Sequence, residues 1–137
     1  MSNTTLVVDD EAVVRRFIMA VLRSGGFQAI EAENGVQALE LLRQLCGAVE
    51  FVVSDIKMPV MDGIALACSV TAEFPAIPII LVSGYADVER AKHPGLNFEF
   101  VQKPFLPDTL LGVVKRVMMP KRKLLLQLCV ESSEPRK

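Results

Sequence analysis

Aromatic side chains, cysteine and net charge are scarce in this sequence. It has no tryptophan, one tyrosine, one histidine and three cysteines among 137 residues, and its formal net charge is −1. With acidic and basic residues nearly equal in number, the sequence shows no electrostatic footprint for nucleic acid. Cys46, Cys68 and Cys129 are odd in number and have no CxxC spacing. They are therefore expected to be buried or neutral thiols in a reducing compartment.

Long hydrophobic runs are absent too. No apolar run approaches the roughly 18 residues of a membrane-spanning helix, and the first five residues have neither the charged nor the long apolar region of a signal peptide. Aliphatic side chains are abundant instead, since 51% of the residues are hydrophobic and only 6% are aromatic. A chain of this length is expected to form one domain, with at most a short appendage, and is long enough to bury a core. The sequence thus predicts a soluble, cytoplasmic domain that spans no membrane.

Short apolar runs alternate with amphipathic stretches along the chain. The runs predict strands at residues 6–8, 27–32, 51–53, 77–82 and 98–101. The stretches predict helices at residues 12–23, 36–45, 62–73, 86–92 and 107–118, the fourth ended by His93-Pro94-Gly95. Five β-α units in strict alternation predict an α/β fold, a doubly wound five-stranded parallel sheet with helices on both faces.

Burial patterns add two expectations. The first, third and fourth runs are almost continuously aliphatic, as in strands buried on both faces. The first two helices are expected to bury the faces formed by Val13, Phe17, Ala20 and Val21, and by Val36, Leu39, Leu42 and Leu45.

Polar side chains stand where four of the predicted strands end. Asp9 and Asp10 follow the first strand, Asp55 the third, Ser83 the fourth and Lys103 the fifth. Ligands of open α/β sheets bind outside the carboxyl ends of the strands. In the strand order 2-1-3-4-5 all five side chains would converge on one crevice. Each alone is better explained as a cap, a turn or a solvated charge, but their coincidence at four strand ends is not.

Three carboxylates and a lysine in one crevice suit phosphoryl transfer. Carboxylates a few ångströms apart repel one another unless a cation neutralises them or some of them take up protons. Oxygen ligands suit Mg²⁺, which retains several waters and binds one or two carboxylates together with a phosphate. One carboxylate is then free to attack phosphorus, while Lys103 and the Ser83 hydroxyl bind the phosphoryl oxygens.

Four motifs carry a resemblance to a known family. They are LVVDDE at Leu6–Glu11, DIKMPVMDG at Asp55–Gly63, LVSGY at Leu81–Tyr85 and VQKPF at Val101–Phe105. In order and spacing they resemble the receiver domains of two-component response regulators, over residues 4–119. The resemblance implies the flavodoxin-like strand order 2-1-3-4-5.

The resemblance also implies a role for each site residue. Asp55 would be the phosphorylation site, and Mg²⁺ or Mn²⁺ would be bound by Asp10, Asp55, the backbone carbonyl of Lys57 and, through water, Asp9. Ser83 and Lys103 would bind the phosphoryl group. Phe100 would be the aromatic switch residue, and Lys103–Pro104 the position of a cis peptide bond.

The implied function is that of a phosphoprotein switch. A histidine kinase or phosphotransfer protein would pass a phosphoryl group from its phosphohistidine to Asp55, which would change the surface around the fourth and fifth strands. The chain would catalyse only its own phosphorylation and dephosphorylation. Two departures are Ser83 in place of the commoner threonine and the Pro94-Gly95 interruption, which shortens the fourth helix.

The domain boundary is expected near residue 119. Residues 1–119 would form the receiver domain, and residues 120–137 a tail that is an extra helix or the remnant of a linker. Its apolar run from Leu124 to Val130 is expected to pack on the domain's own surface or on a second copy, giving a homodimer. His93, beside a loop proline and glycine, is expected to be solvated.

Several alternatives differ in class. A haloacid-dehalogenase-type phosphatase also uses an aspartate nucleophile and Mg²⁺, but it has a second aspartate two positions later, where this sequence has Lys57. A degenerate receiver would only bind a protein partner, yet here every site position is filled. A receiver segment of a hybrid histidine kinase would show the same motifs. A flavodoxin-type protein lacks support because no phosphate-binding loop follows the first strand.

Overall fold

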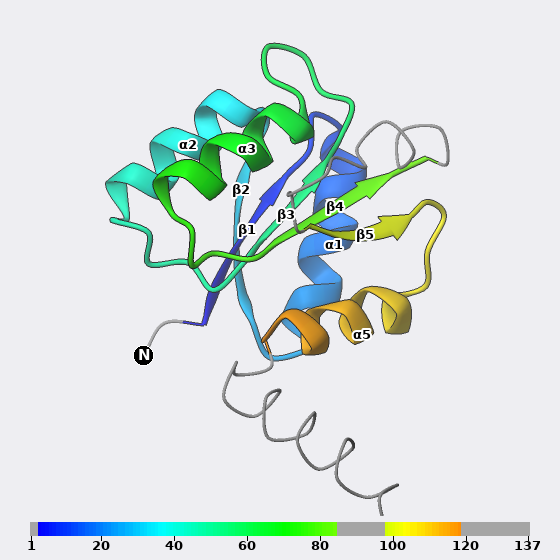
Figure 1. Ribbon diagram of the computed structural model, residues 1–137. Coiled ribbons are helices and arrows are strands. Elements are labelled where there is room, and N and C mark those ends of the chain that lie inside the picture. Colours follow the sequence, from blue (N-terminus) through cyan, green and yellow to red (C-terminus); the bar gives the residue numbers. More distant parts are fainter. Residues whose placement is uncertain (1–2, 85–97, 119–137) are drawn as a thin grey trace, which may run out of the picture.

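A parallel sheet with helices on both faces forms the computed structural model, which describes residues 3–84 and 98–118 (Figure 1). Its strands are β1 (Thr4–Val8), β2 (Gln28–Ala32), β3 (Val52–Asp55), β4 (Ile79–Ser83) and β5 (Glu99–Gln102). Its helices are α1 (Ala12–Ser24), α2 (Gly35–Gln44), α3 (Gly63–Glu73) and α5 (Pro107–Met118). These bounds agree closely with the predicted alternation of strands and helices.

The strands lie in the order β2-β1-β3-β4-β5, and every neighbouring pair is parallel. This confirms the predicted fold class and strand order. Every residue of β3 and β4 is buried, as is all of β1 except Thr4. The three aliphatic runs are therefore the interior strands, covered on both faces.

Two hydrophobic cores lie on opposite faces of the sheet. Helices α2 and α3 cover one face and α1 and α5 the other (Figure 1). Side chains alternate between the two cores along a strand, so Leu6 and Val8 point to the α2–α3 side and Val7 to the α1–α5 side. The carboxyl ends of the strands are thereby packed between the two layers of helices, which fixes the loops that follow them.

The predicted buried face of α1 is wrong. Val13 is 79% exposed, Phe17 is 44% exposed and Ala20 is exposed, so only Val21 of the predicted set is buried. The face against the sheet instead consists of Arg15, Ile18, Met19, Val21 and Leu22. Apolar residues occupy two adjoining sides of this helix, and tertiary packing selects the second. That choice leaves Val13 and Phe17 on the surface.

The α2 prediction is half right. Leu39 and Leu42 are buried, whereas Val36 and Leu45 are 42% and 38% exposed. Val36 lies in the first turn and Leu45 is the C-cap, so both lie at the ends of the helix. Cys46 and Cys68 are free and exposed, so the first alternative of the expected buried or neutral thiols is wrong for these two cysteines.

Other predictions fall outside the described residues. These are the short helix at 86–92, the His93-Pro94-Gly95 break, Cys129 and the tail at 120–137, so the expected 119/120 boundary stays a prediction. Within the described ranges, none of the helices has the length and apolar character needed to cross a membrane.

Candidate functional site

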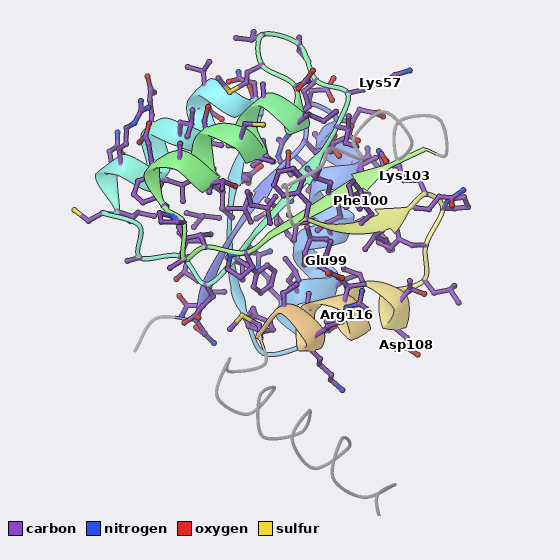
Figure 2. All side chains as sticks on the ribbon, in the orientation of Figure 1. Lys57, Glu99, Phe100, Lys103, Asp108 and Arg116 are labelled. Carbon is purple, nitrogen blue, oxygen red and sulfur yellow. The ribbon has the colours of Figure 1, made fainter. Side chains whose placement is uncertain are left out.

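The polar residues singled out in the sequence lie together at the carboxyl ends of the strands. Asp9 and Asp10 lie between β1 and α1, Asp55 and Ser83 are the last residues of β3 and β4, and Lys103 follows β5. Lys57 and Lys103 are labelled on the same side of the molecule in Figure 2. The strand order thus brings these residues of separate motifs to one crevice.

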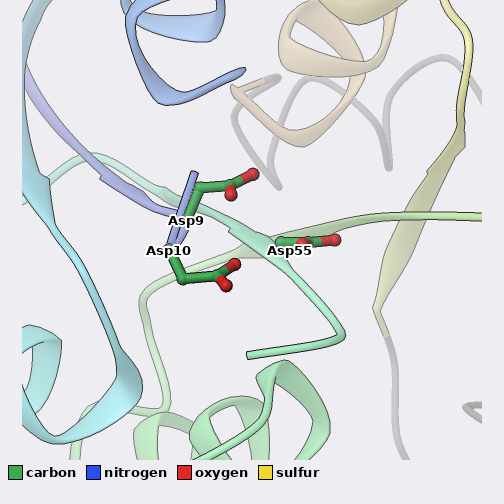
Figure 3. A group of neighbouring side chains, drawn as sticks. All are labelled: Asp9, Asp10 and Asp55. Atoms are coloured by element: carbon green, nitrogen blue, oxygen red, sulfur yellow. The ribbon is translucent and has the colours of Figure 1, made fainter. Parts of the chain in front are cut away.

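Three aspartates form the centre of the site (Figure 3). One carboxylate oxygen from each of Asp9, Asp10 and Asp55 lies within 4.8 Å of the others. Asp9 is fully buried, Asp55 is 6% exposed and Asp10 is exposed. Like charges at this separation repel, and burial removes the water that would screen them.

The electrostatics of the site follow from that arrangement. The pKa of Asp9 is raised to about 6, first by burial and then by the charges of Asp55 and Asp10, against the Glu11 amide and Lys103. The pKa of Asp55 is raised as well, because burial outweighs the charge and hydrogen bond of Lys103. Without a cation, the crevice therefore favours partly protonated carboxylates.

Lys103 places an ammonium group next to the acidic cluster. Its Nζ lies 3.3 Å from Asp55 Oδ1, and its backbone N–H donates to the Ser83 carbonyl at 2.8 Å. The Lys103–Pro104 peptide bond is cis. The end of β5 is thus bonded to the end of β4, and this fixes the ammonium group beside Asp55.

The residues present fit a hard divalent cation. Asp9 Oδ2 and Ser83 Oγ are buried and have no hydrogen-bond partner among residues 3–84 and 98–118. Orphaned buried oxygens are costly, and a hydrated metal ion or an anion bound in the crevice would satisfy them. A hollow lined by Asp10, Lys57, Met58, Pro59 and Asp62 opens beside the acidic cluster. The donor set is all oxygen, which suits Mg²⁺ or Mn²⁺.

The loop between β3 and α3 is packed tightly against the phosphoryl-acceptor candidate. A Cβ on Gly63 would lie 2.1 Å from the Asp55 carbonyl oxygen, so only glycine fits there. The Gly63 N–H donates to the Ile56 carbonyl at 2.8 Å, and the Asp62 side chain caps α3 by accepting from the Ala65 N–H at 2.8 Å. The β3–α3 loop and the first turn of α3 therefore determine where the Asp55 backbone lies.

Phe100 lies on β5, in register with Leu81 of β4, and is half-buried against the core on the α2–α3 side (Figure 2). It therefore lies on the strand next to the one that Ser83 ends.

The sequence did not reveal the roles of three residues that hold the backbone around the site. Arg15 is 7% exposed and donates to the Asp9 carbonyl, Ser54 Oγ donates to the Asp55 carbonyl at 2.8 Å, and Gly63 makes the close approach described above. Arg15 had a detectable signal, since it shares the i, i+3, i+4, i+7 spacing of Ile18, Met19 and Leu22.

Comparison with known proteins decides the family. The family described as response regulator receiver domain matches residues 5–115 of this sequence. The chain belongs to that family. Receiver domains are the regulated partners in two-component signalling, and phosphorylation is their typical chemistry. The assignment decides against the phosphatase and flavodoxin alternatives.

Individual relatives support the same assignment. The sensor kinase CckA of Brucella abortus is 40% identical over 119 residues, which cover 85% of this chain and 13% of the kinase. A chemotaxis protein CheY homolog of Campylobacter jejuni is 40% identical over 119 residues, 82% of this chain and 90% of that protein. A receiver domain protein of Clostridium thermocellum has a TM-score of 0.80 at 23% identity, over 92% of this chain and 99% of that one, a likeness of fold alone.

Many relatives are much longer than this receiver domain. The chain spans between 13% and 27% of the length of seven curated relatives that it matches. Those relatives include a sensor kinase and transcriptional regulators. What the family establishes here is the receiver function, that of a signalling switch.

Proposed function

We propose that this receiver domain accepts a phosphoryl group on Asp55 from the phosphohistidine of a histidine kinase or phosphotransfer protein. The single observation that supports this most is the cluster of Asp9, Asp10 and Asp55 with Lys103 Nζ 3.3 Å from Asp55. An isolated acidic cluster of this kind is unfavourable, and a cation with an incoming phosphoryl group makes it favourable. A degenerate receiver would have no need of this complete set.

The transfer step exchanges one bond to phosphorus for another. An Asp55 carboxylate oxygen attacks phosphorus, the new P–O bond forms as the P–N bond to the donor histidine breaks, and the histidine nitrogen leaves with the electron pair. Lys103 moves its ammonium from the Asp55 carboxylate to a phosphoryl oxygen, where it stabilises negative charge. Bound Mg²⁺ supplies neutralising charge, which lets two anions approach each other.

Asp10 and Asp55 would bind that cation directly, with the Lys57 backbone carbonyl as the third protein ligand and Asp9 acting through water. Asp10 suits direct binding because its carboxylate is exposed next to the hollow. Asp9 suits an indirect role because one of its oxygens already accepts from the Glu11 N–H at 2.9 Å.

Ser83 and Phe100 would relay the phosphorylated state. Ser83 Oγ is buried and bonds to none of the residues that the structure describes, and its hydroxyl could donate to a phosphoryl oxygen. Its movement toward the site would open space near β5 that the half-buried Phe100 ring can enter. A shift of this kind needs contacts that differ between the two states, and the phosphoryl group supplies them.

A protein donor would contact the apolar surface beside Lys103. Phe17 and Phe105 touch with ring centroids 5.8 Å apart, and Val13 and Leu106 beside them are 79% and 71% exposed. We call these four residues the donor patch. A shallow hollow adjoins the patch at Phe17 and Phe105, and it is also lined by Val14, Lys103 and Pro104. Lys103 belongs to both this hollow and the site, so a protein donor that contacts the patch would lie next to Asp55.

Incubation with Mg²⁺ and acetyl phosphate tests the assignment. We expect one phosphoryl group per chain, as a mass addition at Asp55 that hydroxylamine removes because the product is an acyl phosphate. The addition should be absent in Asp55→Asn and in excess chelator. The Glu73→Gln variant, which changes an exposed carboxylate paired with Arg43 between α2 and α3, is the matched control and should be labelled normally. Stoichiometric labelling of Asp55→Asn at another residue would refute the proposal. A wild-type chain that takes no phosphate would support the protein-binding alternative.

A further inference from the structure

Arg15 is a buried charged residue on α1, and its guanidinium group bonds to two other segments. Nη1 donates to the Asp9 carbonyl at 2.7 Å, and Nε donates to Glu31 Oε1 of β2 at 2.6 Å. The bond to Asp9 is buried, whereas the Glu31 side chain is 49% exposed. The neighbouring Arg16 and Arg23 of the same helix are exposed. Arg15 is thus committed to the interior next to the acidic cluster.

The atom that Arg15 holds is the carbonyl oxygen of the peptide bond between Asp9 and Asp10. The Asp9 N–H donates to the Ala32 carbonyl at 3.2 Å, and Asp9 Oδ1 accepts from the Glu11 N–H at 2.9 Å. With the Arg15 bond, backbone and side chain of Asp9 are all held in place. The plane of the next peptide group, and with it the direction in which Asp10 leaves the strand, is then fixed.

We propose that Arg15 is a positioning residue of the cation site, which holds the Asp9–Asp10 peptide so that the Asp10 carboxylate faces Asp9 and Asp55. This inference rests on the proposed cation binding by Asp10. A guanidinium group suits the task because its planar fork donates to two acceptors in fixed directions, whereas a lysine ammonium is a point charge on a flexible stem. Groups that orient metal ligands commonly contribute about 10-fold or more to metal affinity.

Direct measurement of Mg²⁺ binding by calorimetry on the full chain at neutral pH tests the role. Arg15→Met keeps the volume of the side chain and removes both bonds, and it should weaken Mg²⁺ binding about 10-fold. Arg15→Lys retains the charge and should recover only part of that loss. In metal-free protein, the amide resonances of Asp10 and Glu11 should shift in Arg15→Met, since their peptide plane is no longer fixed.

Two matched variants separate positioning from general destabilisation. Ile18→Val removes a methylene from the fully buried residue one turn along the same face of α1, and it should lower the melting temperature without changing Mg²⁺ affinity. Glu31→Gln removes the carboxylate and leaves the Asp9 contact, so affinity should stay within about 2-fold of wild type, well short of the roughly 10-fold loss above.

Contrary results are clearly defined. Mg²⁺ affinity of Arg15→Met within 2-fold of wild type would overturn the inference, as would an equal loss in Ile18→Val or Glu31→Gln. Absence of Mg²⁺ binding by the wild-type chain would instead refute the proposed cation site itself. The two failures are therefore distinguishable in one set of titrations.

Discussion

Asp9 is the fully buried member of the acidic cluster, and it couples the site to folding. Its pKa, raised to about 6 chiefly by burial, is above that of an aspartate in the unfolded chain. The folded state therefore binds a proton that the unfolded state releases between about pH 4 and pH 6. In the absence of metal, the domain is therefore less stable at pH values at which Asp9 is charged.

We expect the metal-free domain to become more stable as the pH falls from 7 to 5. The sign follows from linkage: a group with a raised folded pKa takes up its proton on folding, so acid favours the folded state until the unfolded pKa is reached. The gain should be on the order of 1–3 kcal/mol in the free energy of unfolding. Urea titrations followed by circular dichroism would measure it, because the chain lacks tryptophan.

Asp9→Asn is the control for that measurement. It removes the titrating group, so the free energy of unfolding should depend less on pH between pH 5 and pH 7. Saturating Mg²⁺ should reverse the trend in the wild type, since cation binding requires deprotonated carboxylates. Parallel pH profiles for the wild type and Asp9→Asn would show that another group controls stability in this range.

Among the elements, the β3–α3 loop has the least room for change. Gly63→Ala should lower the free energy of unfolding by about 1–3 kcal/mol, because the new Cβ would lie 2.1 Å from the Asp55 carbonyl oxygen. The displaced Asp55 backbone should also slow phosphorylation by acetyl phosphate. Gly112→Ala is a matched control, since Gly112 is exposed in α5 and a Cβ there would have no atom of the described residues within 4 Å. That variant should gain about 0.4–1 kcal/mol. Equal stability changes in the two variants would contradict the steric argument.

Helix α1 illustrates what the sequence alone could and could not reveal. The site was predictable because strand ends are visible as transitions from aliphatic to polar residues, as at Val8-Asp9 and Val82-Ser83. The buried side of α1 was not, because periodicity fits two adjoining apolar faces equally well. Contact with the sheet decides between them, and it buries Arg15 while exposing Phe17. The role of Gly63 was equally hidden, since a close backbone approach leaves no periodic signature.

The exposed side of α1 yields a prediction about the phosphoryl donor. Phe17→Ala should slow phosphotransfer from a cognate histidine kinase or phosphotransfer protein at least 5-fold, through loss of apolar contact in the donor patch, on the scale of about 1 kcal/mol. Phosphorylation by acetyl phosphate should be unchanged, because a small donor does not touch the patch. Val36→Ala, an exposed apolar residue on α2, should leave both rates unaltered. Equal slowing with both donors would place the defect in the site rather than at the surface.

At the scale of the whole molecule, the two layers of helices should respond differently to phosphorylation. We expect beryllofluoride and Mg²⁺ to change amide hydrogen exchange mainly around Ser83, Phe100 and Lys103, and in the loops that follow β1 and β3. The reason is that the new contacts form at the ends of β4 and β5, whereas α2 packs on the far strands. Exchange in α2 is the internal reference. Changes concentrated in α2, with β4 and β5 unaffected, would contradict the proposed readout.

An open sheet has two edge strands, and here their composition has a further consequence. Among the described strands, β2 and β5 are hydrogen-bonded to a neighbour on one side only. Both are short, with five and four residues, and both carry charged and amide side chains, Gln28 and Glu31 in β2 and Glu99 and Gln102 in β5. Such edge strands are poor templates for an added strand, because a second chain would have to pair alongside their charged side chains. The domain is thereby protected from growing edge to edge into β-aggregates, even where it is abundant.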